Sequence, residues 1–312
     1  MVTSNGVNRR AFLAAAMGAG SLAAAGGRME FCVFSKHLQF LGWAEMAAAA
    51  KEMGFDGVDL TVRKGGHVTP ERVADDLPKA AEAIRKAGSR LTMITTDIID
   101  MTSAHAAPVL RAAKSVGITH YRWDGYKYKD GVALPEQLKE FAPRVKDLAA
   151  FNKELGLCAM YHTHSGAGRV GASQWDLWML LRDMDKRYVS FNFDVAHATI
   201  EGGLGGWLHS TKLAMPHIGG IALKDFKWAR GGNGKWRVDW CPINDGMVQT
   251  REFLKMAKAG GFAGPVQVHF EYDLGGADKG AAKITMAKAE VMKAMQKDLA
   301  ALRAAAAEAG WA

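Results

Sequence analysis

Cysteine is scarce in this chain, which has only Cys32, Cys158 and Cys241 among its 312 residues. None of the three belongs to a CxxC or CxxH spacing, so the sequence excludes the usual cysteine-based metal sites. An odd count permits at most one disulfide, and we expect none. Cys32 and Cys158 lie in apolar, strand-like runs, where a free cysteine packs as a small hydrophobic residue.

Glycine-rich phosphate loops are absent as well. The chain contains neither GxGxxG nor GxxxxGK[ST], one of which an open nucleotide-binding sheet would need. Beyond the N-terminal segment it also lacks an apolar, uncharged stretch long enough to span a bilayer. These absences argue against an open doubly wound sheet and against stable membrane insertion. Nearly half of the residues are hydrophobic, so we expect a large folded core.

The first 25 residues have the features of an export signal. The run NRRAFL at positions 8–13 resembles a twin-arginine signal, an Ala- and Gly-rich stretch follows, and residues 23–25 offer a small-residue cleavage site. The alternative is an Ala-rich leader or anchor helix with a chance arginine pair. We expect residues 1–25 to be removed, so that residues 26–312 form a single domain in the periplasm.

Positive charge is spread along the chain. The formal net charge is +8, and subtracting Arg9 and Arg10, the only charged residues of the signal, leaves +6. Lysines in residues 79–86 and 283–297 alternate with alanine and glutamate, which is typical of a solvated helix face. We therefore expect no nucleic-acid partner. Self-association into a homo-oligomer is left open by the sequence.

Short apolar runs alternate with amphipathic segments along the rest of the chain. The predicted strands fall at 31–34, within 54–60, and at 91–96, 119–123, 157–162, 189–193, 218–223 and 266–270. The predicted helices cover 43–53, 70–87, 104–115, 135–155, 173–185, 250–259 and 277 to the end, with a less regular segment before the strand at 218–223. Eight strand-helix units at this length predict an α/β fold, a closed (β/α)8 TIM barrel. An open doubly wound sheet is the alternative.

The longest irregular connection, residues 226–249, contains Trp228, Trp236 and Trp240. Loops of this length in compact domains are often functional lids, and aromatic rings flanked by lysine and arginine suit the apolar faces of sugars. A glycine-turned hairpin that packs its tryptophans on the barrel rim is the other interpretation.

Polar residues follow four of the late strands where those strands end. They are YHTHSG at 161–166, NFDVAH at 192–197, ALKD at 222–225 and VHFE at 268–271. In a parallel barrel such ends meet at one mouth. Alternation along each strand places His162 with His164, Asn192 with Asp194, and Gln267 with His269 and Glu271 on shared faces. Histidine, aspartate and glutamate gathered there favour an enzyme site.

These residues, in this order, resemble the xylose isomerase-like TIM-barrel superfamily, which includes sugar isomerases and epimerases, inosose dehydratases and endonuclease IV. The resemblance covers roughly residues 30–275 and rests on GFDGVD at 54–59, DVAHA at 194–198, LKD at 223–225, NDGMV at 244–248 and Glu271. FSKHLQ at 34–39, GGHV at 65–68 and HFEY at 269–272 look like an exported branch of it.

The resemblance implies a divalent metal ion (Mn, Co, Zn or Mg) held at the ends of strands five to eight. Asp194 and Glu271 match two of the usual ligands, His162 takes the strand-five place with His164 as a second candidate, and the usual strand-seven histidine falls at Ala222. His197 or the extra strand-five histidine is left to complete the set.

The implied chemistry is proton abstraction next to a sugar carbonyl, as in an isomerase or epimerase, or in a lyase or hydratase of 3-keto sugars. His269 or Lys224 would move the proton, with Glu271 remaining from the glutamate pair of the epimerases. The expected substrate is a small sugar or keto-glycoside. Its candidate contacts, each alternatively a rim ion pair, are Lys36, His37, Arg63, His67, Asp97, Arg122, His197, Asp225 and Trp228.

Two other functions compete with this one. The missing strand-seven histidine and the tryptophan-rich loop fit a non-catalytic periplasmic sugar-binding barrel. A nuclease of the endonuclease IV kind would need further histidines on strands two and three, where strand three offers Thr95, Thr96 and Asp97.

Overall fold

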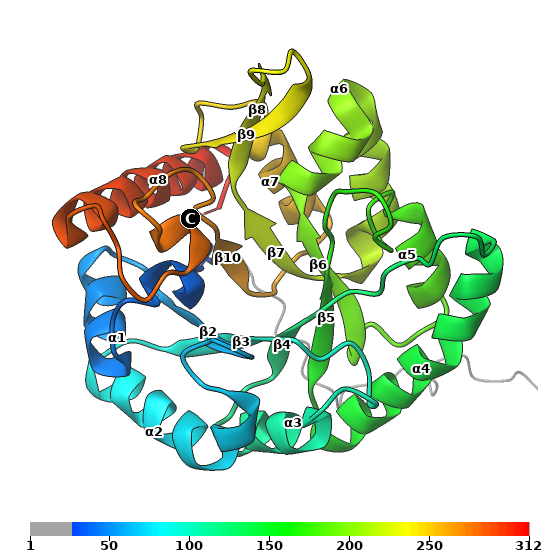
Figure 1. Ribbon diagram of the computed structural model, residues 1–312, viewed down its shortest axis with the longest axis horizontal. Coiled ribbons are helices and arrows are strands. Elements are labelled where there is room, and N and C mark those ends of the chain that lie inside the picture. Colours follow the sequence, from blue (N-terminus) through cyan, green and yellow to red (C-terminus); the bar gives the residue numbers. More distant parts are fainter. Residues whose placement is uncertain (1–26, 312) are drawn as a thin grey trace, which may run out of the picture.

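A closed barrel of eight parallel strands forms the centre of the molecule (Figure 1). The computed structural model describes residues 27–311, so the expected export signal at 1–25 lies outside the described residues. The barrel strands are β1 (Phe31–Phe34), β2 (Gly57–Val62), β3 (Leu91–Thr96), β4 (His120–Trp123), β5 (Cys158–His162), β6 (Val189–Asp194), β7 (Ile218–Leu223) and β10 (Val266–Val268). They close in the order β1-β10-β7-β6-β5-β4-β3-β2. The predicted TIM barrel is confirmed, with β10 as its eighth strand.

Helices surround the strands as an outer ring (Figure 1). They are α1 (Trp43–Glu52), α2 (Val73–Lys86), α3 (Ala106–Ser115), α4 (Leu134–Leu155), α5 (Trp175–Leu181), α6 (Val195–Ala214), α7 (Thr250–Ala259) and α8 (Lys288–Glu308), with short 3-10 turns at Ser35–Leu38, Pro70–Arg72, Met215–His217 and Ala277–Lys279. In α2 the buried residues Val73, Leu77, Ala80 and Ile84 recur every three or four positions, so one stripe of the helix packs on the barrel.

The three cysteines are free and buried, which agrees with the expectation of no disulfide. Cys32 and Cys158 join Met93 and Met160 in a small apolar cluster separate from the main core. Met160 lies on β5 two residues before His162, so alternation puts both side chains on the same face of the strand. A sulfur-rich layer therefore comes before the polar residues on that face.

Strand register brings the polar ends to neighbouring positions. His162 pairs with Asn192, Asp194 pairs with Ala222, and Ala222 pairs with Gln267. Ala222 is fully buried, so the place of the strand-seven histidine lies directly between Asp194 and Gln267.

Two sequence predictions of local structure were wrong or incomplete. The segment after β6 is the helix α6, kinked at Gly203 (φ 56°, ψ −150°). Its four glycines between 202 and 206 weaken the helical signal, whereas the burial of Trp207 stabilises the fold around it. The last helix begins only at Lys288, because residues 275–285 form a separate loop closed by the bond from Thr285 N to Gly275 O.

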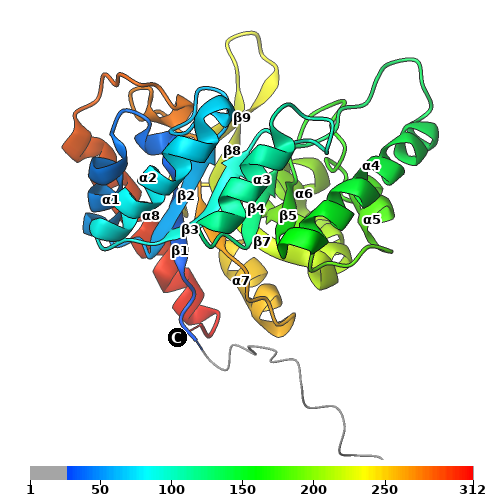
Figure 2. The same cartoon turned by 90° about the horizontal axis from the view of Figure 1, so that it is seen from below.

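The long connection after β7 is a two-stranded hairpin, β8 (Asp225–Arg230) and β9 (Trp236–Cys241). It projects from the barrel on the side opposite the C-terminus (Figure 2). Of the two interpretations of residues 226–249, the hairpin is the one observed. Within residues 27–311 there is no helix with the length and apolar character that crossing a membrane requires.

Candidate active site

A buried group of imidazoles and one carboxylate lies at the strand ends. His162, Asp194 and His269 each offer a ligand atom within 4.8 Å of the others, and their exposed fractions are 6%, 0% and 2%. They come from the ends of β5, β6 and β10, three strands that the barrel closure brings together. Two more histidines adjoin the group, since the ring of His164 stacks on that of His197 at 3.9 Å.

Asp194 is placed by the junction between β6 and α6. Its Oδ1 accepts hydrogen bonds from the backbone N–H groups of Ala196 (3.0 Å) and His197 (3.1 Å) and so caps the helix. Its own N–H donates to Thr163 Oγ1. Oδ2 is buried without a hydrogen bond, although Lys224 Nζ lies 3.2 Å away at ion-pair distance. Burial raises the pKa of Asp194, and the charge of Lys224 opposes that rise.

Lys224 and His197 form the second half of the group. Lys224 Nζ lies 2.7 Å from His197 Nε2 and 4.6 Å from the centre of the Trp240 ring. His197 Nδ1 lies 2.7 Å from Ser165 Oγ. Because an ammonium group only donates, His197 accepts through Nε2 and donates from Nδ1 to Ser165. Lys224 thus bridges Asp194 and His197 beneath an aromatic face.

Two buried amides connect His162 with His269. Gln267 Oε1 lies 3.1 Å from His269 Nε2 and 3.3 Å from Asn192 Nδ2, and the same Asn192 nitrogen lies 3.3 Å from His162 Nδ1. Each imidazole therefore has one ring nitrogen held by an amide and the other turned toward the site. Ligating histidines are commonly oriented by such outer hydrogen bonds.

All four histidines are held neutral near pH 7. Burial lowers the pKa of His162, His197 and His269 well below its usual value and that of His164 to about 4, and nearby cations lower them further, Arg122 next for His162 and Lys224 next for the other three. Neutral imidazoles are proton acceptors and metal ligands.

Glu271 lies beside the group and is paired with Lys36. Lys36 Nζ is 3.1 Å from Glu271 Oε2, and His269 Nδ1 is 3.9 Å from Oε1. Burial alone would raise the pKa of Glu271, but Lys224 and Lys36 outweigh it and lower the pKa to about 2. Glu271 is thus an ionised carboxylate next to the metal-ligating candidates, and it is not one of the three converging residues.

The ring of Phe34 provides an apolar surface near the Glu271–Lys36 pair. His269 stacks on its ring at 4.7 Å, and the guanidinium groups of Arg63 and Arg122 lie 5.5 and 5.6 Å from its centre. Lys36, Arg63 and Arg122, all expected as substrate contacts, are therefore near the group.

Two of the expected substrate contacts have structural roles instead. His37 is fully buried, with Nδ1 bonded to Ala277 O and Nε2 accepting from Phe270 N. Both ring nitrogens are thus used by the backbone. The carboxylate of Asp225 accepts four backbone N–H groups, from Phe226, Asn244, Gly246 and Val248. It organises the loop after the hairpin, and these bonds leave little for a ligand.

The other expected contacts lie farther out. His67 bonds Thr61 within its own turn, and Asp97 is exposed and accepts from Lys64 N. Trp228 is 39% exposed and faces Trp236 across an apolar hollow of about 410 Å³. The tryptophan that reaches the site is Trp240, which the sequence reasoning did not single out. Hairpin register explains it, since Trp240 pairs with Phe226 close to the base of the hairpin.

The residues present fit a divalent cation. Asp194 Oδ2 is buried without a hydrogen bond, and two imidazoles with one carboxylate suit Zn, Mn or Co. As oriented, the Asn192 nitrogen faces His162 Nδ1, which places the ring proton on Nε2. A half-turn of the Asn192 amide would present its oxygen, which now has no partner, and free Nε2 for a metal. Lys224 would also have to move away from Asp194.

The fold and this set of side chains define a TIM barrel with an imidazole–carboxylate site at the ends of its strands. The sequence profile of the Xylose isomerase-like TIM barrel family matches residues 47–303. The chain belongs to that family.

Solved structures repeat the fold at low identity. The 3-keto-D-glucoside 4-epimerase of E. coli is 13% identical with a TM-score of 0.65, over 89% of this chain and 100% of that one. The probable 3-DHS dehydratase of Bacillus anthracis is 14% identical with a TM-score of 0.65, over 87% and 99%. An IOLI protein with bound zinc is 13% identical with a TM-score of 0.68, over 88% and 98%. No curated protein sequence matches the chain.

Proposed function

We propose that this protein is a sugar-modifying enzyme that moves a proton at the carbon next to a carbonyl group. Its substrate would be a sugar or keto-glycoside, and its reaction either isomerisation, epimerisation or loss of a β substituent. The observation that carries the proposal is the buried convergence of His162, Asp194 and His269 beside Lys224 and Glu271. The epimerase and dehydratase among the similar folds support this reaction class.

We assign the holding of a divalent cation to His162, Asp194 and His269. When bound there, the cation would polarise the carbonyl oxygen of the substrate as a Lewis acid. This assignment differs from the roles inferred from sequence, where Glu271 was a ligand as well as a catalytic candidate and proton transfer was given to His269 or Lys224. The reason is position: His269 is in the converging set and Glu271 is held by Lys36.

The chain's own residues then supply acid and base. Glu271 is ionised and would take the proton next to the carbonyl once substrate displaces Lys36, because losing that partner raises the basicity of the carboxylate. Lys224, already a donor to His197, would return a proton from the side of Asp194. His164 and Trp240 pack against His197 and limit the access of water to that pair.

A non-catalytic sugar-binding barrel remains the competing proposal, and a specific observation favours it. Ala222 is fully buried at the strand-seven position, so the site has no fourth ligand there, and Lys224 already supplies a positive charge to Asp194.

The discriminating experiment is turnover in deuterated water. Ketohexoses and 3-keto-glucosides are incubated with the purified protein and added Mn, Co, Zn or Mg, and the products are examined by mass spectrometry. We expect deuterium at the carbon next to the carbonyl, or a substrate isotope effect at that carbon if a shielded base returns the same proton. Binding without turnover would favour the sugar-binding barrel.

A further inference from the structure

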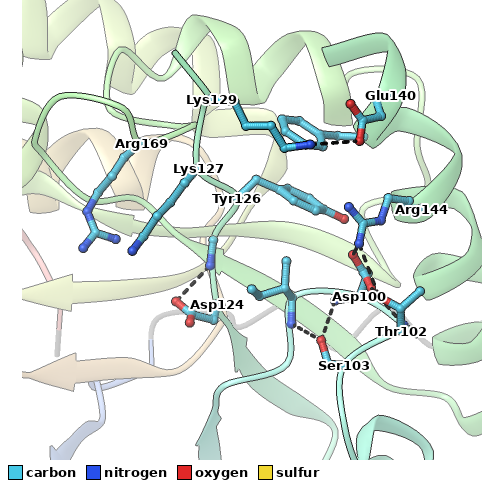
Figure 3. Close-up of a pocket in the computed structure, with 13 residues that line it drawn as sticks. Asp100, Thr102, Ser103, Asp124, Tyr126, Lys127, Lys129, Glu140, Arg144 and Arg169 are labelled. Carbon is cyan, nitrogen blue, oxygen red and sulfur yellow. Dashed lines mark hydrogen bonds and ion pairs between the residues drawn. The ribbon is translucent and has the colours of Figure 1, made fainter. Parts of the chain in front are cut away.

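A polar cavity of about 630 Å³ lies beside the barrel mouth, between the loop that follows β4 and the helix α4. Its lining includes four cationic side chains (Figure 3). Two of them are already neutralised within the cavity: Arg144 pairs with Asp100 at 2.9 Å, and Lys129 lies 3.7 Å from Glu140. The other two cations of the cavity, Lys127 and Arg169, form no ion pair with any acid among residues 27–311.

Lys127 and Arg169 stand directly opposite each other on two short extended segments. An isolated antiparallel bridge joins them, and the flanking backbone bonds run from Tyr128 N to Gly168 O (2.7 Å) and from Val170 N to Tyr126 O (3.2 Å). This pattern makes them a non-hydrogen-bonded pair, the type whose side chains are closest. Figure 3 shows the two side chains extending alongside each other, away from Arg144 and Glu140.

The backbone beneath this pair is fixed by a buried tyrosine. Tyr161 Oη accepts from Tyr126 N at 2.8 Å and donates to Val170 O at 3.0 Å, so one hydroxyl joins both segments. Gly125 is required by the same contact, because a Cβ at that position would lie 2.8 Å from Tyr161 Oη. The two cations are therefore held side by side by a rigid support.

Like charges directly opposite on paired strands destabilise the fold. The cavity carries one further acid, Asp124, but it makes no ion pair with either cation, and its Oδ1 accepts from Gly125 N. A bound anion would relieve the repulsion between Lys127 and Arg169. Arg169 is also among the charges that lower the pKa of His164 and His197, behind burial and Lys224.

We propose that Lys127 and Arg169 form an oxyanion subsite that binds a phosphate or carboxylate group. If the proposed function holds, this group belongs to the substrate, which is then an anionic sugar. A fork of guanidinium donors beside an ammonium suits either group. The binding itself does not depend on catalysis or on a metal.

The test measures the binding of glucose 6-phosphate, glucuronate and glucose to the metal-free protein by calorimetry at low salt. The protein is compared with Lys127→Gln/Arg169→Gln and with Arg182→Gln/Lys212→Gln, a control that removes two exposed charges elsewhere. At least one of the two anions should bind more tightly than glucose. Its affinity should fall about 10- to 100-fold in the first double variant, the range expected for lost charge-assisted hydrogen bonds, and hold in the control. Preference for one anion identifies the group.

Equal affinity for glucose, no loss in Lys127→Gln/Arg169→Gln, or an equal loss in the control would overturn the proposal. A second readout guards against a folding defect: removal of the repelling pair should leave the melting temperature unchanged or raised, and the preferred anion should raise it only when Lys127 and Arg169 are present. This test measures binding and not turnover. If the protein binds the anion through Lys127 and Arg169 but converts no sugar, the subsite stands and the proposed function fails.

Discussion

Lys224 Nζ and His197 Nε2 lie 2.7 Å apart in the buried centre of the site. Since an ammonium group has no lone pair, the contact fixes the proton of neutral His197 on Nδ1, where Ser165 accepts it. A cation buried in this position must also have its charge balanced. Here Asp194 balances it at 3.2 Å.

Replacing Lys224 should release this tautomer. In Lys224→Met the donor to Nε2 is lost, so we expect the ¹⁵N spectrum of His197 to change from the Nδ1–H pattern to a mixture of tautomers. Lys227→Met, which removes an exposed lysine three residues away on β8, is the control and should leave the spectrum unchanged. An unaltered Nδ1–H signal in Lys224→Met would show that Ser165 alone sets the tautomer.

Substitutions of Glu271 and of His269 should have different effects on turnover and metal binding. Glu271→Gln removes the proposed base and should lower turnover about 10²- to 10⁴-fold while the protein keeps its metal. His269→Gln removes a proposed ligand and should lower metal affinity first. The reverse pattern, with metal lost from Glu271→Gln and kept by His269→Gln, would restore the roles inferred from sequence. Metal content and initial rates of both variants decide between the two assignments.

Asp59 should make stability depend on pH. Burial raises the pKa of Asp59 to about 7, against the hydrogen bonds from Thr95 and the charges of Arg122 and Arg63. The folded protein therefore holds this proton up to about pH 7, whereas an unfolded chain releases it near pH 4. The contribution of protonated Asp59 to the free energy of unfolding is therefore fully present below pH 4 and is lost as the pH rises to 7.

Asp59→Asn removes that dependence. The free energy of unfolding of Asp59→Asn minus that of the unmodified protein should rise by at most about 4 kcal/mol between pH 4 and 7. Above pH 7 this difference should stay level. Urea unfolding at a series of pH values measures it, and the values at pH 4 serve as the internal reference. A difference that does not change with pH would mean that Asp59 ionises normally in the fold.

Export should depend on the arginine pair at the N-terminus. In Arg9→Lys/Arg10→Lys the twin-arginine signal is lost, so we expect precursor to accumulate in the cytoplasm. Cell fractionation with immunodetection measures it. The same amount of processed protein in the periplasm, with or without the pair, would leave the Ala-rich leader as the better interpretation.

Sequence alone predicted which of these side chains lie together, because alternation along a strand decides which side chains share a face. That rule placed Asn192 with Asp194 and Gln267 with His269, and the barrel closure then brought the strands together. It could not assign roles, because the ligand set depends on side-chain positions: Glu271 is turned to Lys36 by an ion pair between residues 235 positions apart.

Contacts between distant segments account for what was missed. Trp240 reaches His197 only through the register of the hairpin, and Lys127 meets Arg169 through one bridge between two loops. The helix α6 was missed for a different reason, since its glycines weaken local propensity and tertiary packing overrides it.

The metal content of the purified protein shows directly whether Asp194 helps to hold a divalent cation. Asp194→Asn keeps a side-chain oxygen to cap α6 but removes the negative charge from Oδ2, so the barrel should stay folded. Asp100→Asn, another buried carboxylate outside the site, is the matched control. We predict one divalent ion per chain in the unmodified protein and in Asp100→Asn, and loss of that ion in Asp194→Asn. Full metal occupancy in Asp194→Asn, or none in the unmodified protein after incubation with Mn, Co, Zn and Mg, would contradict it.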